Sequence, residues 1–546
     1  MAPGKGQKDE ADVARIEEVA HVTSVVQKYE NDLSHRKTIR AYPYAIVWSI
    51  VFATAIIGEG FDLALFGNFF SMVQFKELFG TATPPKGEME IPAAWQSAIL
   101  ASGQVGQLLG MTLAGKCSVV FGYRKTMMAA LASVAFLLLI NFFAAEVRLS
   151  TGSAAHGLGM ISAGEFLLGM PWGTFQACVL PYASDIAPMK LRPTLTTFVS
   201  MCWIIGQLLS TGAIKASSGI VGDVVKAYHI PVALQWTWPL PVLFFVWKAP
   251  ESPWWLVRED RRDEAHTVLR RLNRSPDYPA REQVRVLETT NEQEKMETEN
   301  ISYMECFRGA NRRRTVIVLM TQVTQQLCGS SLMFYSAKVY QKAGMDMGRS
   351  YDLTLVQYAL GMVCIAASWW LMGRFGRRTI WLWGIGGISF LMTAVGIMGL
   401  FMHAHVALPW MIAALLIIFT GVYNLSVGPL VYAINPEITS TRQKSMTLVL
   451  GRFTYLLAGQ FNMWLLPRML EDAPNGWGLG PGAALVYAGL SFGFFVWAYC
   501  CLPEVRDRTP AQMDELFRMN TPARKFRHAR FGETGAFEIS SGNKQV

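Results

Sequence analysis

Charged residues are scarce in this chain. Asp, Glu, Lys and Arg together make up only 16% of its 546 residues, whereas 51% of the residues are hydrophobic. A typical soluble domain carries roughly 25% charged residues. The charges that are present gather between long stretches that have almost none. This segregation argues against a soluble globular protein and indicates a chain that crosses a membrane many times.

Motifs that define several other function classes are also missing. There is no GxxxxGK[ST] loop to cradle phosphates, so ATP-driven pumping has no support. No nucleophile–base pair or metal-ligand spacing is found, and most of the eight cysteines fall within apolar stretches as packing residues. Residues 1–40 are polar and lack an apolar core segment, which predicts that there is no secretory signal. We therefore expect a protein that is not an enzyme and holds no metal or cofactor.

What the chain has instead is a series of long apolar runs. A hydrocarbon core of about 30 Å takes about 20 residues per helix, and twelve runs reach that length. They lie near residues 43–71, 94–116, 127–146, 157–180, 194–215, 231–249, 314–336, 353–372, 379–402, 408–433, 446–467 and 482–502. The sequence therefore predicts an all-α membrane protein with twelve transmembrane helices in two six-helix halves. The expected parts are a tail (1–42), the first half (43–257), a loop with short helices (258–313), the second half (314–503) and a second tail (504–546).

A two-part signature occurs once in each half. GYRKT (122–126) and PESPWWLV (250–257) stand in the first half, and GRFGRRT (373–379) and PEVRDRT (503–509) stand at matching places in the second. Repeats that span half of a polytopic chain are typical of secondary transporters, whose substrate site lies between the halves.

Each half also carries an acidic residue followed by an arginine, at the inner ends of spans four and ten. Asp185 precedes Arg192, and Glu437 precedes Arg442. We expect ion pairs here that hold one conformation and break as the halves rock. The candidate gating residues are Arg124, Asp185, Arg192, Arg377, Arg378, Glu437 and Arg442.

Lysine and arginine collect in alternate loops. Examples are Arg36, Arg40, Arg124, Arg377 and Arg506, whereas the loops between them are poor in both residues. By the positive-inside rule, both termini are predicted to be cytosolic. These loops account for the net charge of +9, so the expected partners include a lipid bilayer and no nucleic acid.

Three acidic residues lie within the predicted spans, where a charge is costly and usually serves a function. Glu59 and Asp62 stand three residues apart in GEGFD, so they share one helical face, and Glu165 lies within span four. Two nearby carboxylates in a weakly polar cavity tend to share a proton, because ionising both is unfavourable. We interpret these acids as a proton-coupling site. The alternative is that they cap helix ends or pair with basic residues.

Amides and aromatic residues form a second polar group within the spans. TQVTQQLCGSS (321–331) places three glutamines near the middle of span seven. Amides both donate and accept hydrogen bonds, which suits the hydroxyl groups of a sugar, and aromatic faces suit the apolar face of a pyranose. The alternative for any one amide is a bond to a neighbouring helix. The candidate substrate-binding residues are Gln207, Gln322, Gln325, Gln326, Tyr335, Asn424 and Tyr432.

Taken together, the motifs resemble those of the sugar porter family of the major facilitator superfamily. The residues that carry the resemblance are GYRKT, YASDIAPMKLR (182–192), PESPWWLV, QQLCGSS (325–331), GRFGRRT, GPLVYAINPEITSTR (428–442) and PEVRDRT, and they cover roughly residues 40–517. Within the family, EGFD (59–62), AGEFLLGMPWG (163–173) and PWW (253–255) resemble the fungal α-glucoside:proton symporters, which are maltose-permease-like.

The resemblance implies twelve helices, alternating access and import of a glycoside across the plasma membrane. Acids that match Glu59, Asp62 and Glu165 are associated with proton coupling in the α-glucoside symporters. Positions that match Gln207, Gln325, Gln326 and Tyr432 line the sugar site in sugar porters generally.

The chain departs from the family pattern at several positions. Hydrophobic residues at 119 and 120 replace the usual charges before GYRKT, and the residue after Arg192 is a proline in place of glycine. Other departures are Tyr432 for tryptophan, Ser331 and Phe453 for asparagine, and Ser200 for an amide.

These departures make the expected pocket less amide-rich and bear on the choice of substrate. Our main hypothesis is a proton-coupled importer of α-glucosides. The alternatives are a facilitative hexose transporter, a metabolite exporter and a sugar sensor that does not transport.

Overall fold

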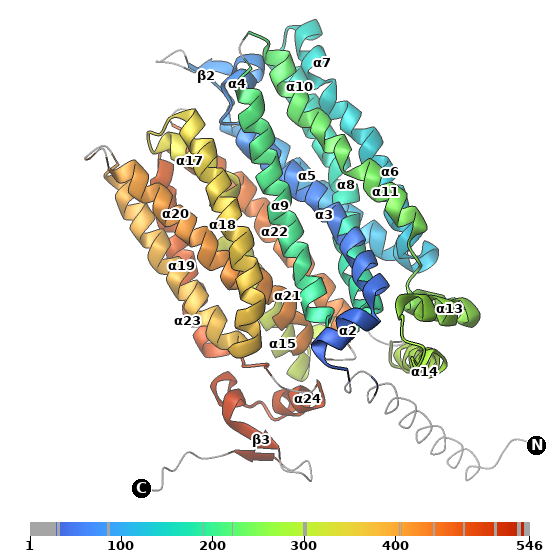
Figure 1. Ribbon diagram of the computed structural model, residues 1–546. Helices are drawn as coiled ribbons and strands as arrows, with labels where there is room; N and C mark the ends of the chain where they lie inside the picture. The colour runs from blue at the N-terminus through green and yellow to red at the C-terminus, as the bar shows by residue number, and fades with distance from the viewer. Residues whose placement is uncertain are drawn as a thin grey trace, which may run out of the picture.

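The computed structural model describes residues 29, 33–83, 88–188, 190–220, 222–298, 303–402, 405, 407–440, 443–472, 476–506, 510–531 and 537–539. Long helices lie side by side in one bundle, with the first half on one side and the second half on the other (Figure 1). This agrees with the all-α membrane fold that the apolar runs predict. The helices that connect the two halves and the described residues nearest to both termini lie at one end of the bundle (Figure 1).

The first half extends from α3 to α11. Its elements, with the short helix that precedes it, are α2 (His35–Ala41), α3 (Pro43–Phe69), α4 (Val73–Phe79), β1 (Thr81–Thr83), β2 (Glu88–Glu90), α5 (Ala93–Phe121), α6 (Tyr123–Phe142), α7 (Ala144–Thr151), α8 (Ala154–Ile186), α9 (Arg192–Ser218), α10 (Val224–Leu234), η1 (Gln235–Thr237) and α11 (Pro239–Lys248). The two strands form an antiparallel hairpin.

Short helices connect the first half to the second. They are α12 (Pro253–Arg258), α13 (Arg262–Leu272), α14 (Ala280–Thr298) and η2 (Tyr303–Phe307). The second half contains α15 (Gly309–Leu327), α16 (Ser331–Phe334), α17 (Ser336–Lys342), α18 (Met347–Arg374), α19 (Arg377–Leu400), α20 (Leu408–Leu425), α21 (Val427–Ile438), α22 (Lys444–Leu470), η4 (Gly480–Ala483) and α23 (Ala484–Cys501). It is followed by α24 (Pro510–Arg518), η5 (Ala523–His528), β3 (Ala529–Phe531) and β4 (Phe537–Ile539).

Four of the predicted spans are interrupted helices. Span three consists of α6 and α7, span six of α10 and α11, span seven of α15 to α17, and span ten of α20 and α21. The break after α15 falls at Gly329, whose φ of 101° lies in the left-handed region that favours glycine. The break between α10 and α11 ends at Pro239, the first residue of α11. Proline has no backbone N–H, so it cannot donate the hydrogen bond that would continue the preceding helix. Interrupted helices of this kind commonly line transporter binding sites.

Hydropathy separates the helices into two groups. Among the described residues, eight helices are long and apolar enough to cross a membrane by composition alone. The predicted spans outside this group correspond to α5, α8, the α15–α17 segment and α22. These are the helices that carry most of the buried amides and several of the buried charges described below. Their lower hydropathy is therefore a sign of where the polar site lies.

Glycines bring α5 and α8 into close contact. A Cβ on Gly106 of α5 would lie 2.1 Å from the backbone oxygen of Phe166, and one on Gly169 of α8 would lie 2.2 Å from the backbone oxygen of Gly103. No side chain fits in either place, so only glycine allows the two backbones to approach this closely. The approach holds Glu165 of α8 against the middle of α5.

The two ends of the bundle differ in composition. We call the end that carries α13, α14 and α24 the basic end (Figure 1), because Arg124 bonds to Glu251 just before α12, and Arg374 bonds to Arg506 just before α24. We call the opposite end, which carries α4 and the β1–β2 hairpin, the hairpin end (Figure 1).

Candidate functional site

Two of the predicted acids form a buried carboxyl pair in the first half. Asp62 of α3 is 4% exposed and Glu165 of α8 is 5% exposed, and the two carboxyl groups are close enough to interact directly. The indole nitrogen of Trp172 donates to Asp62 Oδ2 at 3.0 Å, and Gln235 donates to Asp62 Oδ1 at 2.5 Å. Asn141 donates to Glu165 Oε1 at 2.6 Å. Two carboxyl groups held in contact away from water are suited to sharing one proton.

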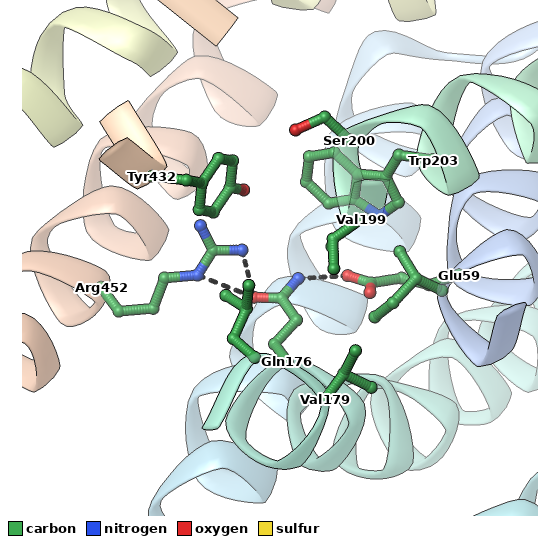
Figure 2. Close-up of a pocket in the computed structure, with 10 residues that line it drawn as sticks. Glu59, Gln176, Val179, Val199, Ser200, Trp203, Tyr432 and Arg452 are labelled. Carbon is green, nitrogen blue, oxygen red and sulfur yellow. Dashed lines mark hydrogen bonds between the residues drawn. The ribbon is translucent and has the colours of Figure 1, made fainter. Parts of the chain in front are cut away.

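The third acid, Glu59, makes different contacts. Its Oε1 accepts hydrogen bonds from Gln107 of α5, at 3.2 Å, and from Gln176 of α8. The Gln176 carbonyl in turn accepts from the guanidinium of Arg452 on α22, with the Nε contact at 2.9 Å (Figure 2). An acid of the first half is thus linked to a cation of the second half through one amide.

Glu59 and Asp62 take different hydrogen-bond partners, although the helical repeat places them on one face of α3. The two residues do share one side of α3, but Asp62 is held by Trp172 and Gln235, whereas Glu59 reaches Gln107 and Gln176. Residues three apart share a helical face, yet the partners on the packed helices decide where each side chain points.

A small pocket lies between the halves beside this link. Helix α3 contributes Glu59, α8 contributes Gln176, and α9 contributes Ser200 and Trp203 (Figure 2). From the second half, Tyr432 of α21 and Arg452 of α22 complete the wall, and the Arg452 guanidinium also lies over the Tyr455 ring at 4.1 Å. Of the predicted substrate-binding residues, Tyr432 alone lines this pocket.

The predicted glutamines of α15 are buried, and their amide oxygens lack hydrogen-bond partners among the described residues. This holds for Oε1 of Gln322, Gln325 and Gln326, which are 6%, 3% and 4% exposed. Gln325 also donates to the backbone oxygen of Gly428 at 3.0 Å, so one of its amide groups joins α15 to α21. Buried acceptors without donors are costly unless a ligand or water supplies the donor.

The remaining predicted substrate residues are buried at separate places. Gln207 of α9 is 3% exposed. Tyr335 lies between α16 and α17 with its ring stacked on Phe70 at 6.2 Å, and its hydroxyl has no partner among the described residues. Asn424 donates to the backbone oxygen of Thr420 one turn earlier in α20 at 2.9 Å, so part of its amide is satisfied within its own helix.

At the basic end, the duplicated signature corresponds to a contact that occurs in both halves. Glu251, from PESPWWLV, accepts from the backbone N–H groups of Tyr123 and Arg124 at the start of α6. A Cβ on Gly122 would lie 2.5 Å from Glu251 Oε2. A carboxylate at a helix N-terminus is stabilised by the unpaired N–H groups and the helix dipole.

The second half repeats this packing with other residues. Glu504, from PEVRDRT, lies against Gly376 at the start of α19, where a Cβ would lie 2.1 Å from Glu504 Oε2. In each half, the glutamate that follows the sixth span packs against the glycine that precedes the third span. This contact explains why the two parts of the signature occur together.

The predicted gating residues take several different partners. Arg377 forms an ion pair with Glu437 at 3.3 Å. Arg378 instead donates to the backbone oxygen of Tyr499 on α23 at 2.8 Å. Asp185 accepts from the Ser252 hydroxyl at 2.6 Å.

Two more gating candidates complete this group. Arg192 is exposed at the start of α9, and Arg442 lies outside the described residues.

At the hairpin end, a buried charged cluster joins the halves. Lys338 of α17 and Glu471, which follows α22, form an ion pair in the second half. Gln96 of α5, which is fully buried, donates to Glu471 Oε1 at 2.5 Å and accepts from Lys338 at 3.0 Å. The Ser71 and Tyr351 hydroxyls also lie within hydrogen-bond distance, 3.0 Å, across the halves. The halves are thus held together by polar contacts at this end.

Comparison with known proteins places the chain in a family. A family model described as "Sugar (and other) transporter" matches residues 48–517. The chain belongs to this family of sugar transporters. It is 31% identical over 537 residues to a maltose permease of Saccharomyces cerevisiae, covering 97% of this chain and 85% of that protein. It is 34% identical over 499 residues to an alpha-glucosides permease of the same species, covering 90% and 80%.

Solved structures support the same fold. The xylose transporter XylE from E. coli, in a partially occluded inward-open conformation, superimposes with a TM-score of 0.69 and 18% identity, covering 86% of this chain and 100% of that chain. A proton:xylose symporter XylE bound to 6-bromo-6-deoxy-D-glucose gives a TM-score of 0.70 and 19% identity, covering 87% and 99%. The sugar transporter therefore has the twelve-helix major facilitator fold, and the family that its sequence matches is one of transporters.

The sequence interpretation of this sugar transporter missed four polar residues that form contacts between helices. Arg452 lies within predicted span eleven, so the criterion that singled out the acids, a charge inside an apolar span, would have found it. Lys338 and Glu471 stand just beyond the ends of predicted spans and gave no such signal. Gln176 resembles any other amide in sequence, and only the structure shows that it joins Glu59 to Arg452.

Proposed function

We propose that this sugar transporter is a proton-coupled importer of α-glucosides that works by alternating access. The observation that carries the proposal is the buried carboxyl pair of Asp62 and Glu165, which lies in the same half as Glu59 and its link to Arg452. The maltose and α-glucoside permeases that resemble the chain over most of its length support the choice of substrate.

The carboxyl pair is the group that would carry the proton. With one proton shared, Asp62 and Glu165 hold a single negative charge that Trp172, Gln235 and Asn141 can solvate by donating hydrogen bonds. Loss of that proton leaves two negative charges in contact in a buried site, which is unfavourable. The pair should therefore release its proton only in a conformation that admits water to it.

Glu59 and Arg452 would connect the protonation state to the position of the halves. An ionised Glu59 attracts Arg452 through Gln176 and draws α22 toward α3 and α8. A protonated Glu59 loses most of this attraction, so the halves can part more easily. The substrate site lies between the same halves, so sugar and proton act on one equilibrium.

We place the basic end in the cytosol and the hairpin end outside a plasma membrane. The clustering of arginine at the basic end supports this orientation through the positive-inside rule. An inward proton then carries about 2.3 kcal/mol per 100 mV of membrane potential, enough to concentrate a neutral sugar more than about tenfold.

Uptake by intact cells tests the proposal. The chain would be expressed in a yeast strain that lacks its own sugar transporters, and uptake of labelled α-glucosides would be followed together with the pH of an unbuffered medium. We expect uptake of a disaccharide with alkalinisation of the medium, and loss of both with Glu165→Gln. The matched control is Glu77→Gln, which changes an exposed glutamate of α4 at the hairpin end.

The other outcomes separate the alternatives. Disaccharide or hexose uptake without alkalinisation would identify a facilitator and contradict proton coupling. No uptake by a protein that reaches the plasma membrane would contradict the import of α-glucosides and favour an exporter or a sensor.

A further inference from the structure

Two glutamines from opposite halves converge on one glycine near the middle of the bundle. Gln104 belongs to α5 of the first half, Gln326 to α15 of the second half, and Gly459 to α22. A Cβ built on Gly459 would lie 2.9 Å from Oε1 of Gln104 and 3.2 Å from Nε2 of Gln326. Both amides therefore lie over the same bare stretch of α22, and any larger residue at 459 would displace them.

Neither amide oxygen is satisfied by the protein. Gln104 is 8% exposed and Gln326 is 4% exposed, and the Oε1 of each has no hydrogen-bond donor among the described residues. The backbone here is well bonded by contrast, since Asn462 donates to the Gln326 backbone oxygen at 2.8 Å. The two amides meet over the same glycine, and each leaves a buried acceptor that calls for a partner with hydrogen-bond donors of its own.

The same stretch of α5 contacts the acids. A Cβ on Gly103 would lie 3.5 Å from Oε2 of Glu165, and Gln107 donates to Glu59 at 3.2 Å. Gln104 stands between these two positions. A ligand bound at Gln104 would therefore contact the same helix segment that touches both acid sites.

We propose that Gln104 is a sugar-contacting residue of the first half, which binds substrate hydroxyl groups together with Gln326 of the second half, and that Gly459 keeps the space for this contact. Hydroxyl groups donate to acceptors, and a sugar presents several in a fixed arrangement, so the amide pair fits a polyol better than an apolar or purely anionic ligand. This inference rests on the proposed function, because it assumes that the transported solute is a glycoside.

Transport kinetics test the contact. Initial rates of maltose uptake would be measured for the wild type, Gln104→Leu, Gln104→Asn and Gly459→Ala, normalised to the amount of protein at the cell surface. One neutral hydrogen bond contributes about 0.5–1.5 kcal/mol, so we expect Gln104→Leu to raise KM about 2- to 12-fold. We expect the maximal rate to change less than about twofold, since the acids and Arg452 are untouched.

Two comparisons test whether a change in KM is only a folding artefact. Gln104→Asn keeps the amide but shortens it, and should show a smaller rise in KM than Gln104→Leu if it folds. The matched control is Ser102→Ala in the same helix, because the Ser102 hydroxyl bonds to the backbone oxygen of Ile99 in its own helix at 2.7 Å. We expect this control to keep the wild-type KM.

A series of mono-deoxy maltoses gives the decisive readout, because a purely structural role would not affect it selectively. We expect one deoxy analogue to have nearly the same KM with the wild type and with Gln104→Leu, since the hydroxyl group and its partner are then both absent. An equal effect of Gln104→Leu on every analogue would overturn the proposal. The proposal would also be overturned if the wild type transports maltose and Gln104→Leu has the same KM for maltose as the wild type. If the wild type takes up no α-glucoside at all, the proposed function fails and this inference fails with it.

Discussion

Lys338 and Glu471 form an ion pair in which the two side chains are only 2% and 4% exposed. Both belong to the second half, and Gln96 of the first half bonds to each of them. A buried pair of this kind is stable only when its remaining hydrogen-bonding groups are also satisfied. Gln96 supplies these hydrogen bonds. The charge pair of the second half therefore holds the first half in place at the hairpin end.

Loss of the cation from this pair should destabilise the folded protein. Lys338→Met leaves Glu471 buried with Lys342 as its nearest remaining cation, at 3.5 Å. Removing one partner of a buried pair costs about 3–5 kcal/mol, which thermal unfolding of the purified protein in detergent would detect. The double variant Lys338→Met with Glu471→Leu should recover much of the loss. A single variant as stable as the wild type would contradict the interpretation.

Release of Gln96 alone should favour opening at the hairpin end. Gln96→Leu keeps the Lys338–Glu471 pair but removes the bonds that tie it to α5. The accessibility of Ser97→Cys, at a position that is 5% exposed, reports the opening. An impermeant maleimide added to intact cells should label this cysteine faster in the Gln96→Leu background than in the Gln96 background. Equal labelling rates would show that Gln96 does not hold this end closed.

The charge pair should persist in acidic media. Burial alone would raise the pKa of Glu471, but Lys338 and Lys342 outweigh it and lower the pKa to about 2, below the ordinary 4.5. The stability that this shift contributes is fully present above pH 4.5 and is lost only as the pH falls toward 2. The destabilisation caused by Glu471→Gln should therefore be the same at pH 7 and at pH 5. A marked decrease between these values would contradict the assignment.

The duplicated glycines predict two different effects of the same substitution. Gly122 has a φ of 84°, which an alanine adopts only with strain, and its Cβ would meet the Glu251 carboxylate. Gly376 has a φ of −67°, so alanine there meets only the Glu504 carboxylate. Gly122→Ala should lower stability more than Gly376→Ala, by about 1 kcal/mol or more. Thermal unfolding of both variants, with Gly115→Ala as a control in open space, measures the difference.

The sequence predicted the helices well but predicted few of the contacts between them. Long apolar runs and their spacing suffice to locate the spans, because each helix must cover the same hydrocarbon thickness. The carboxyl pair was predicted in part, since both acids stand out as charges in apolar spans. That Asp62 meets Glu165 and not Glu59 depends on how α3 packs against α8, which no local pattern specifies.

The same limit applies to the clusters that join the halves. Gln96, Lys338 and Glu471 are separated from one another by 133 to 375 residues along the chain. Each alone resembles an ordinary polar residue near a helix end. The two-part signature was visible in both halves, but only the structure shows that a glutamate packs against a glycine.

Arg452 should be required for coupling because it is the cation that balances Glu59 across the halves. Its guanidinium reaches Glu59 through Gln176, from a helix of the other half. Arg452→Gln leaves the buried Glu59 without this compensation, and we expect sugar accumulation to fall about tenfold or more, in line with the cost of breaking a buried charge pair. Arg452→Lys should retain part of the activity, since it keeps the charge but loses the two-pronged contact to Gln176.

The double variant separates a charge effect from a packing effect. If Arg452 acts through the charge of Glu59, removing both charges with Glu59→Gln and Arg452→Gln should leave more facilitated exchange of labelled sugar than Arg452→Gln alone, even though accumulation against a gradient stays lost. Exchange is measured in cells preloaded with unlabelled sugar, so it needs no net proton movement. If the double variant is as inactive in exchange as the single one, Arg452 serves the packing of α22 against α8 and the electrostatic link is wrong.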